Sequence, residues 1–194
     1  RQALMMATDF EAIKNDYYGG AAEIDIFPLN KNYAGTGYLS LDKMPQSVRD
    51  LYTYNPEKAK QLLKEAGYPS GFKTTILVPN SGSDVDDLSI FKDMWAKVGV
   101  QLTIDVREPS SFNTIAGQRA YEDMIYRYLW TSWPWMFSMT GFRGPNTFNY
   151  SYINDPPGTD PVLEKYFNLL DQNMMRNMPD VYRLMEEVRP YFME

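Results

Sequence analysis

The chain has 194 residues, of which 44% are hydrophobic and 15% aromatic, so it is long and apolar enough to bury a core. Its formal charge of -6 comes from acidic and basic residues mixed along the chain, which excludes the basic surface that nucleic acids require. The sequence holds neither Cys nor His, and this excludes thiol nucleophiles, Ser-His-Asp triads and the usual zinc and copper sites. Carboxylate-only chemistry and oxygen-ligated metals remain open.

The first part of the chain predicts two helices, a long loop and a strand. Residues 2–18 have apolar side chains at helical spacing and predict one continuous helix. Residues 21–54 lack sustained periodicity and predict a long loop with short pieces of structure. The next helix should begin after Asn55, a capping residue, and end before Gly67. The β-branched run at residues 74–78 then predicts a strand.

Strand and helix patterns alternate along the rest of the chain. This alternation predicts a single α/β domain with parallel neighbouring strands and right-handed crossovers. The expected elements are a helix from about Asp84 to Val98, a strand at Val100–Val106 with one solvated face, a helix capped by Ser110 or Ser111 that runs to about Gln118, a strand at Met124–Leu129 and, after an irregular aromatic-rich stretch, a helical tail from Pro161 to about Glu194 with a break near Asn177.

Four blocks of the sequence resemble motifs of one known family. Residues 54–68, which read YNPEKAKQLLKEAGY, are similar to a hallmark of the family 5 extracellular solute-binding proteins, which include dipeptide, oligopeptide and nickel binders. Residues 1–13 resemble the opening RQALxxAxDxxxI helix of that family. The blocks at residues 96–100 (AKVGV) and 121–130 (YEDM through Trp) match two further motifs in the same order and spacing. The resemblance covers nearly the whole chain.

The resemblance implies a fold and a role. The implied fold class is an α/β lobe like that of periplasmic binding proteins, with a mixed sheet flanked by helices and a C-terminal helical segment. Residues 1–194 then form the second lobe of a two-lobed clamshell, with the first lobe and both hinge strands missing. The implied partners are a peptide or small-molecule ligand, an ABC permease and the missing first lobe of the same chain. We expect an extracytoplasmic monomer with no catalytic residue, no cofactor and no nucleic-acid partner.

The resemblance places the ligand cleft along the aromatic-rich segment that follows the third strand. Ligands of open α/β sheets lie beyond the carboxyl ends of the strands, and aromatic side chains there offer broad and rigid contact area. The alternative is an ordinary core cluster, although three Trp within six residues, interrupted by Pro134, fit neither one strand face nor one helix stripe. The candidate ligand-binding residues are Arg127, Trp130, Ser132, Trp133, Trp135 and Phe137.

Two of these residues leave the ligand class open. Peptide-binding members of the family carry an Asp three residues after the motif tryptophan, where it pairs with the ammonium group of the ligand. Here that position is Trp133, so the resemblance implies that an ordinary peptide with a free N-terminus fits poorly, whereas a neutral, sugar-like or blocked peptide ligand fits better. Arg127 could hold a carboxylate or phosphate in a bidentate fork, or could instead pair with Glu122, Asp123 or Asp105 on the surface.

Two other functions remain as alternatives, namely a glycoside hydrolase fragment that uses only carboxylates and a sensory or scaffold protein that kept the fold and lost transport. Glu122 and Asp123 lie near the aromatic segment, but nothing marks them as an acid and nucleophile pair. The acidic residues at positions 84, 86 and 87 lack the Gly and the distal Glu of an EF-hand loop. We interpret them as helix-start residues that complement the helix dipole, and we expect no metal site.

Overall fold

The computed structural model describes residues 1–26, 38–82, 84–127, 141–145 and 149–194. The contacts of the chain gather in two compact units, each made of two stretches of sequence. The first unit contains Arg1–Ile24 and Arg49–Tyr128, and the second contains Asp25–Val48 and Leu129–Glu194. Helix α3 (Gln46–Leu51) includes residues of both units.

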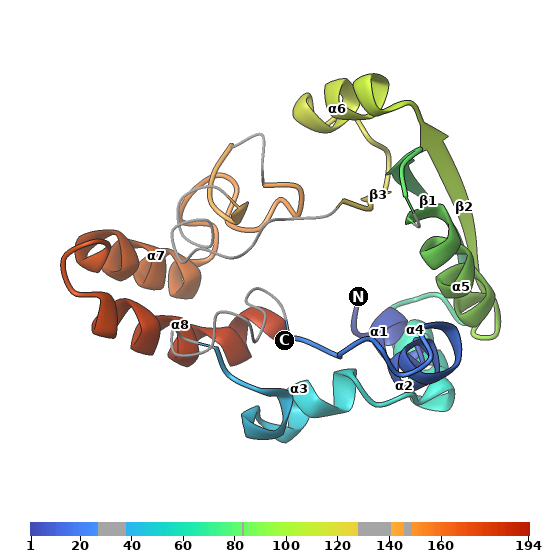
Figure 1. Cartoon of the computed structure of the whole chain (residues 1–194), viewed down its shortest axis with the longest axis horizontal. Helices are drawn as coiled ribbons and strands as arrows, with labels where there is room; N and C mark the ends of the chain where they lie inside the picture. Colours follow the sequence, from blue (N-terminus) through green and yellow to red (C-terminus); the bar gives the residue numbers. More distant parts are fainter. Residues whose placement is uncertain (27–37, 83, 128–140, 146–148) are drawn as a thin grey trace. The chain divides into compact units, whose positions relative to one another are not determined.

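A parallel three-stranded sheet forms the centre of the first unit (Figure 1). The strand order is β2–β1–β3, and the described strands pair only in parallel, where a mixed sheet was expected. β1 and β2 pair along their full length, whereas β3 pairs with β1 at just two positions. The strands are β1 (Phe72–Pro79), β2 (Val100–Arg107) and β3 (Met124–Ile125).

Helix α5 (Asp84–Ala96) covers one face of this sheet (Figure 1). Alternate residues of β1 and β2 point toward it, because side chains alternate across a strand. The cluster between helix and sheet consists of Ile76, Val78, Leu88 and Leu102, with the partly buried Phe91, Trp95 and Tyr126 packed against it. On β2, Gln101 and Thr103 are exposed and Val100 and Leu102 buried, which confirms the predicted solvated face over the first half of the strand. In the second half the alternation fails, because Val106 is exposed as well.

The N-terminal helix is broken where the sequence pattern predicted one continuous helix. The side chain of Asp9 accepts a hydrogen bond from the backbone N–H of Ala12 at 2.9 Å and so starts a new helix. Short polar side chains compete with the backbone in this way, and apolar periodicity alone does not reveal it. The segment contains α1 (Gln2–Met6), α2 (Phe10–Ala12) and a π-helical turn, η1 (Ile13–Tyr17).

The predicted capped helix after residue 55 is confirmed as α4 (Pro56–Glu65). The Asn55 side chain accepts from the backbone N–H of Lys58 at 3.0 Å. The apolar stripe of α4 packs on α1 in a cluster that buries Ala3, Met6, Ala7, Leu51, Ala59, Leu63, Val98 and Val100. This packing joins the first and second motif blocks of the resemblance in one core.

Helix α6 (Pro109–Gly117) begins earlier than expected. Its N-cap is Glu108, which makes no side-chain capping bond, so the prediction that Ser110 or Ser111 caps the helix is wrong. Pro109 accounts for the difference, because the fixed φ of proline suits the first helical position. β3 ends at Ile125, whereas the predicted strand continued to Leu129. Two residues of that predicted strand, Tyr128 and Leu129, lie outside the described residues.

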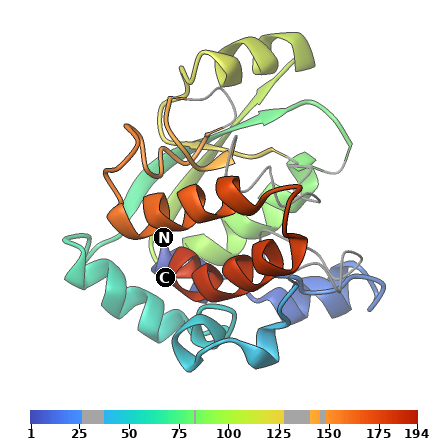
Figure 2. The same ribbon diagram turned by 90° about the vertical axis from the view of Figure 1, so that its left-hand side faces the viewer.

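The second unit is built on a pair of long helices that lie side by side (Figure 2). They are α7 (Pro161–Asn173) and α8 (Met178–Met193), and the short η3 helix (Leu41–Lys43) precedes them in the chain. The expected break near Asn177 is confirmed, since α7 ends before it and Asn177 is the N-cap of α8. Their shared core consists of Phe142, Leu163, Phe167, Leu170, Val181, Leu184, Met185 and Val188.

Across the described ranges, no helix is both long and apolar enough to cross a membrane.

Candidate functional site

The carboxyl edge of the sheet is where the chain leaves all three strands in the same direction. Two backbone hydrogen bonds extend the strand pairing at this edge. The N–H of Asn80 donates to the carbonyl of Arg107 at 2.7 Å, and the N–H of Tyr126 donates to the carbonyl of Leu77 at 2.8 Å. The edge therefore holds Tyr126 and the residue after it in a defined place beside β1.

A tyrosine and carboxylate cluster lies at the start of α5. The hydroxyl of Tyr18 donates to Asp87 at 2.7 Å, and the rings of Tyr17 and Tyr18 meet edge to face with centroids 4.8 Å apart. The hydrogen bond to Asp87, together with partial burial, raises the pKa of Tyr18 to about 12. Burial, followed by the negative charges of Asp87 and Asp84, raises the pKa of Tyr126 to about 12. Both hydroxyls are therefore neutral hydrogen-bonding groups at physiological pH.

Sequence reasoning did not bring these residues together. It treated residues 84–87 as a helix start, which the structure confirms, but gave no role to Tyr18 beyond the end of a helix. The signal was not local, because Tyr18 and Asp87 are separated by 69 positions. Only the folded chain brings Tyr18, the residue after η1, to Asp87 of α5.

Arg127 is the one candidate ligand-binding residue within the described part of the chain. Its guanidinium carbon lies 5.7 Å from the centre of the Phe112 ring, a cation–π contact with α6. Two of the surface carboxylates considered as partners have other contacts. Asp105 binds Arg107 at 2.8 Å, and Asp123 accepts from the N–H of Thr75 at 2.8 Å. Phe112 is itself buried, so the guanidinium of Arg127 lies over a fixed aromatic ring.

The other five candidates, Trp130, Ser132, Trp133, Trp135 and Phe137, lie outside the described residues. Their assignment to a ligand cleft stays a prediction. The described chain reaches Arg127 before this segment and resumes at residue 141 after it.

The two tyrosine hydroxyls at this edge are poor groups for proton transfer near neutral pH. A general acid or base works best with a pKa near the operating pH, and the two tyrosine hydroxyls are far above it. Within the part of the chain that the structure describes, no group of three or more carboxylates is arranged to hold a metal ion. The edge carries aromatic rings, the guanidinium of Arg127, neutral hydroxyls and the carboxylates at the start of α5.

The relatives identified by sequence carry the names of binding proteins. Over 119 residues the chain is 34% identical to a putative ABC transporter peptide-binding protein of Brucella ovis, an alignment that covers 59% of this chain and 21% of the relative. It is 35% identical over 106 residues to heme-binding protein A of Haemophilus influenzae, covering 52% of this chain and 18% of that protein. The chain thus spans about a fifth of the length of these relatives.

Solved structures share the fold over almost the whole chain. HbpA2 from Haemophilus parasuis matches 99% of this chain and 36% of its own, with a TM-score of 0.74 and 25% identity. The oligopeptide-binding protein AppA from Bacillus subtilis, solved with a nonapeptide, matches 99% of this chain and 38% of its own, with a TM-score of 0.75 and 17% identity. Residues 1–151 match the middle part of the bacterial extracellular solute-binding proteins of family 5, and the chain therefore belongs to that family.

Proposed function

We propose that this chain is the second lobe of a two-lobed extracytoplasmic receptor, which captures a peptide-like or other small solute and presents it to an ABC permease. The observation that carries the proposal is the extent of the structural match. Almost all of this chain, 99%, corresponds to 36% of a solved relative, as expected for one lobe of a clamshell. Capture then proceeds by closure, in which solute bound to one lobe recruits the other and hinge motion encloses it.

The proposed cleft wall begins at Arg127 and continues through the aromatic segment. Arg127 offers a guanidinium that Phe112 orients from below, which suits a carboxylate or another planar acceptor on the solute. The tryptophans at positions 130, 133 and 135 would supply stacking surfaces. With Trp133 at the position where peptide-binding relatives carry Asp, the proposed solute is not an ordinary peptide that needs its ammonium group neutralised.

No observation favours either alternative function. A carboxylate-only hydrolase needs two carboxyl groups that are available to the substrate. Asp123 instead accepts hydrogen bonds from Thr74 and Thr75 of β1. The proposed receptor works as a monomer outside the cytoplasmic membrane and catalyses no reaction on the solute.

The test uses the whole protein purified from its native cells. Native mass spectrometry should show a mass in excess of the polypeptide that disappears on denaturation, and the released solute should compact the emptied protein when it is added back. Arg127→Met should lower retention of the solute. The control Arg183→Met removes an exposed, ion-paired arginine on α8 and should retain it fully. Chemical turnover of the solute would contradict the proposed function. Equal retention of the solute by the two variants would contradict the proposed site.

A further inference from the structure

β3 is too short to hold its own position beside β1. Its two residues pair with β1 only at Ile76–Met124 and Leu77–Ile125. A strand this short has few main-chain bonds to oppose slippage, and a slip of one residue moves every side chain to the opposite face. Something beyond the ladder must therefore fix where β3 begins.

The carboxylate of Asp123, which directly precedes β3, makes this connection. One of its oxygens, Oδ2, accepts both from the backbone N–H of Thr75 at 2.8 Å and from the hydroxyl of Thr74 at 3.2 Å. In a regular parallel ladder continued by one more pair, a main-chain carbonyl would accept the Thr75 N–H. The side chain of Asp123 takes the place of that carbonyl, so the ladder is continued by a side chain at the amino end of β3.

The other end of β3 is anchored by the main chain. The N–H of Tyr126 donates to the carbonyl of Leu77 at 2.8 Å. The two anchors, one on each side of a two-residue strand, decide which side chain leaves on which face. Tyr126 packs against the cluster beneath α5, and Arg127 lies over Phe112 of α6. A slip of one residue would exchange these two positions.

We propose that Asp123 is a positioning residue, whose carboxylate fixes the register of β3 and thereby the face of the sheet to which Arg127 projects. That this register matters for solute capture rests on the proposed function. The register itself does not, because it concerns only the pairing of β1 with β3. Asp123 touches no solute in this proposal and acts through the strand that follows it.

Hydrogen exchange at single-residue resolution tests the proposal in the whole protein, with no solute added. Asp123→Ala removes the acceptor, so the amide of Thr75 should exchange roughly tenfold faster. The amide of Tyr126, which Asp123 does not touch, should also exchange faster because the register is released. Amides of β2 that bond to β1 should keep their wild-type rates, since that pairing extends over eight positions.

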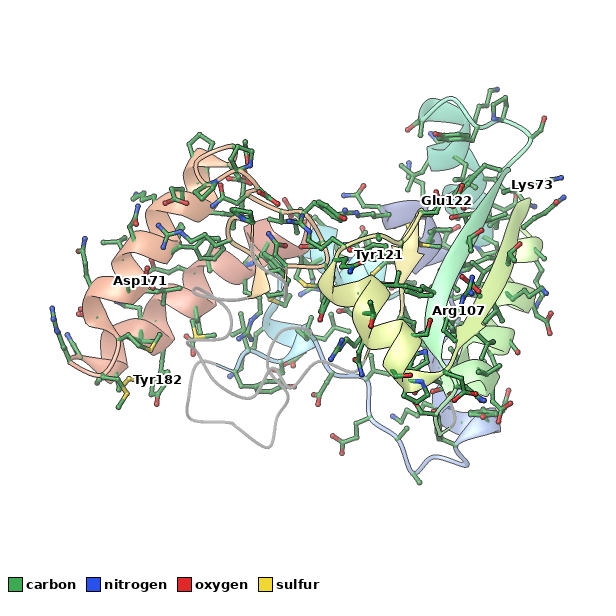
Figure 3. The ribbon with its side chains drawn as sticks, turned by 90° about the horizontal axis from the view of Figure 1, so that it is seen from above. Lys73, Arg107, Tyr121, Glu122, Asp171 and Tyr182 are labelled. Carbon is green, nitrogen blue, oxygen red and sulfur yellow. The ribbon has the colours of Figure 1, made fainter. Side chains whose placement is uncertain are left out.

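Two variants separate positioning from loss of charge or general damage. Asp123→Asn should restore both amides to near wild-type rates, because both bonds end on a single oxygen that an amide side chain retains. Glu122→Ala removes the exposed carboxylate of the residue that precedes Asp123, and it should change neither exchange rate. Figure 3 labels Tyr121 and Glu122 on the turn from α6 into β3.

Three results would overturn the proposal. In the first, the Tyr126 amide stays protected in Asp123→Ala, which would limit Asp123 to a local bond with Thr75. In the second, the amides between β1 and β2 speed up to the same degree, which would indicate general destabilisation. In the third, Asp123→Asn behaves like Asp123→Ala. Because no solute is present, each result stands whether or not the aromatic segment binds one.

Discussion

Arg143 ties together the second unit, and its removal gives a prediction whose size follows from its contacts. The guanidinium donates to Asp171 at 2.6 Å, to Asn168 at 2.7 Å and also to Glu164. The Arg143 and Glu164 side chains are 22% and 21% exposed. Figure 3 labels Asp171 on α7, the helix that supplies all three partners.

Arg143→Met keeps the apolar stem and removes the charge, which leaves two partly buried carboxylates without their cation. Breaking a fully buried ion pair costs about 3–5 kcal/mol, whereas an exposed pair contributes about 0–1 kcal/mol. The Arg143 pairs lie between these limits. Glu164 also keeps a bond from the Asn154 amide at 2.7 Å. We therefore expect a loss of about 2 kcal/mol in the free energy of unfolding at neutral pH.

The pH dependence provides an independent check. The hydrogen bond from Arg143 lowers the pKa of Glu164 below its ordinary value in the folded protein. The unfolded chain therefore binds a proton on Glu164 more readily than the folded chain does. The contribution of the Arg143–Glu164 pair to the free energy of unfolding is complete above the unfolded pKa of about 4.3, and it is lost as the pH falls through the folded pKa. In Arg143→Met the decline in stability on acidification should be shallower.

Urea unfolding followed by circular dichroism, at neutral pH and along the acid limb, measures both effects. The matched control is Arg183→Met, because Arg183 also bridges two carboxylates, Asp180 and Glu187, but lies on the exposed face of α8 with 55% of its side chain accessible. The midpoint of urea unfolding of that control should equal the wild-type midpoint. Equal midpoints for the two variants, or an unchanged acid limb in Arg143→Met, would refute the reasoning.

Two further variants test local backbone geometry. Gly71→Ala should destabilise the first unit severely in a thermal melt, because the new Cβ would lie 1.9 Å from the carbonyl oxygen of Gly99. Gly67 has a similar positive φ but open space around it, so Gly67→Ala should cost only about 1 kcal/mol in the same melt. Met175 is 87% exposed and has a φ of 61°, a backbone conformation that glycine adopts without strain, so Met175→Gly should stabilise the protein by about 1 kcal/mol. Met175→Ala keeps the strained backbone and should show no such gain. An equal gain from both variants would argue against backbone strain.

The regular elements could be predicted because their determinants are local. The cap at Asn55 and the alternation along β2 each lie within one element, and both were predicted from neighbouring residues. The break at Asp9 and the start of α6 at Pro109 were missed where one residue outweighed the wider pattern. Such local competition is visible in the sequence only when a capping side chain or proline is weighed against periodicity.

The candidate site could be predicted only in part, because its contacts are long-range. Arg127 was identified by its place in a motif, yet its ring partner Phe112 belongs to a different element. Of the carboxylates considered for Arg127, Asp123 spans 48 positions to reach Thr75, a bond that no pattern within either segment indicates. Sequence reasoning thus pointed to Arg127, and the structure supplied its contact with the Phe112 ring.

The departure at Trp133 and the environment of Asp87 support the same view of the solute. The resemblance implies that peptide-binding members carry an Asp for the ligand ammonium at the position where this sequence has Trp133. Asp87 lies at the same edge of the sheet, but it accepts the Tyr18 hydroxyl and raises its pKa to about 12. This hydrogen bond takes up part of the acceptor capacity of the Asp87 carboxylate. Within the proposed function, we therefore propose a solute recognised by stacking, hydrogen bonds and the guanidinium of Arg127 rather than by its positive charge.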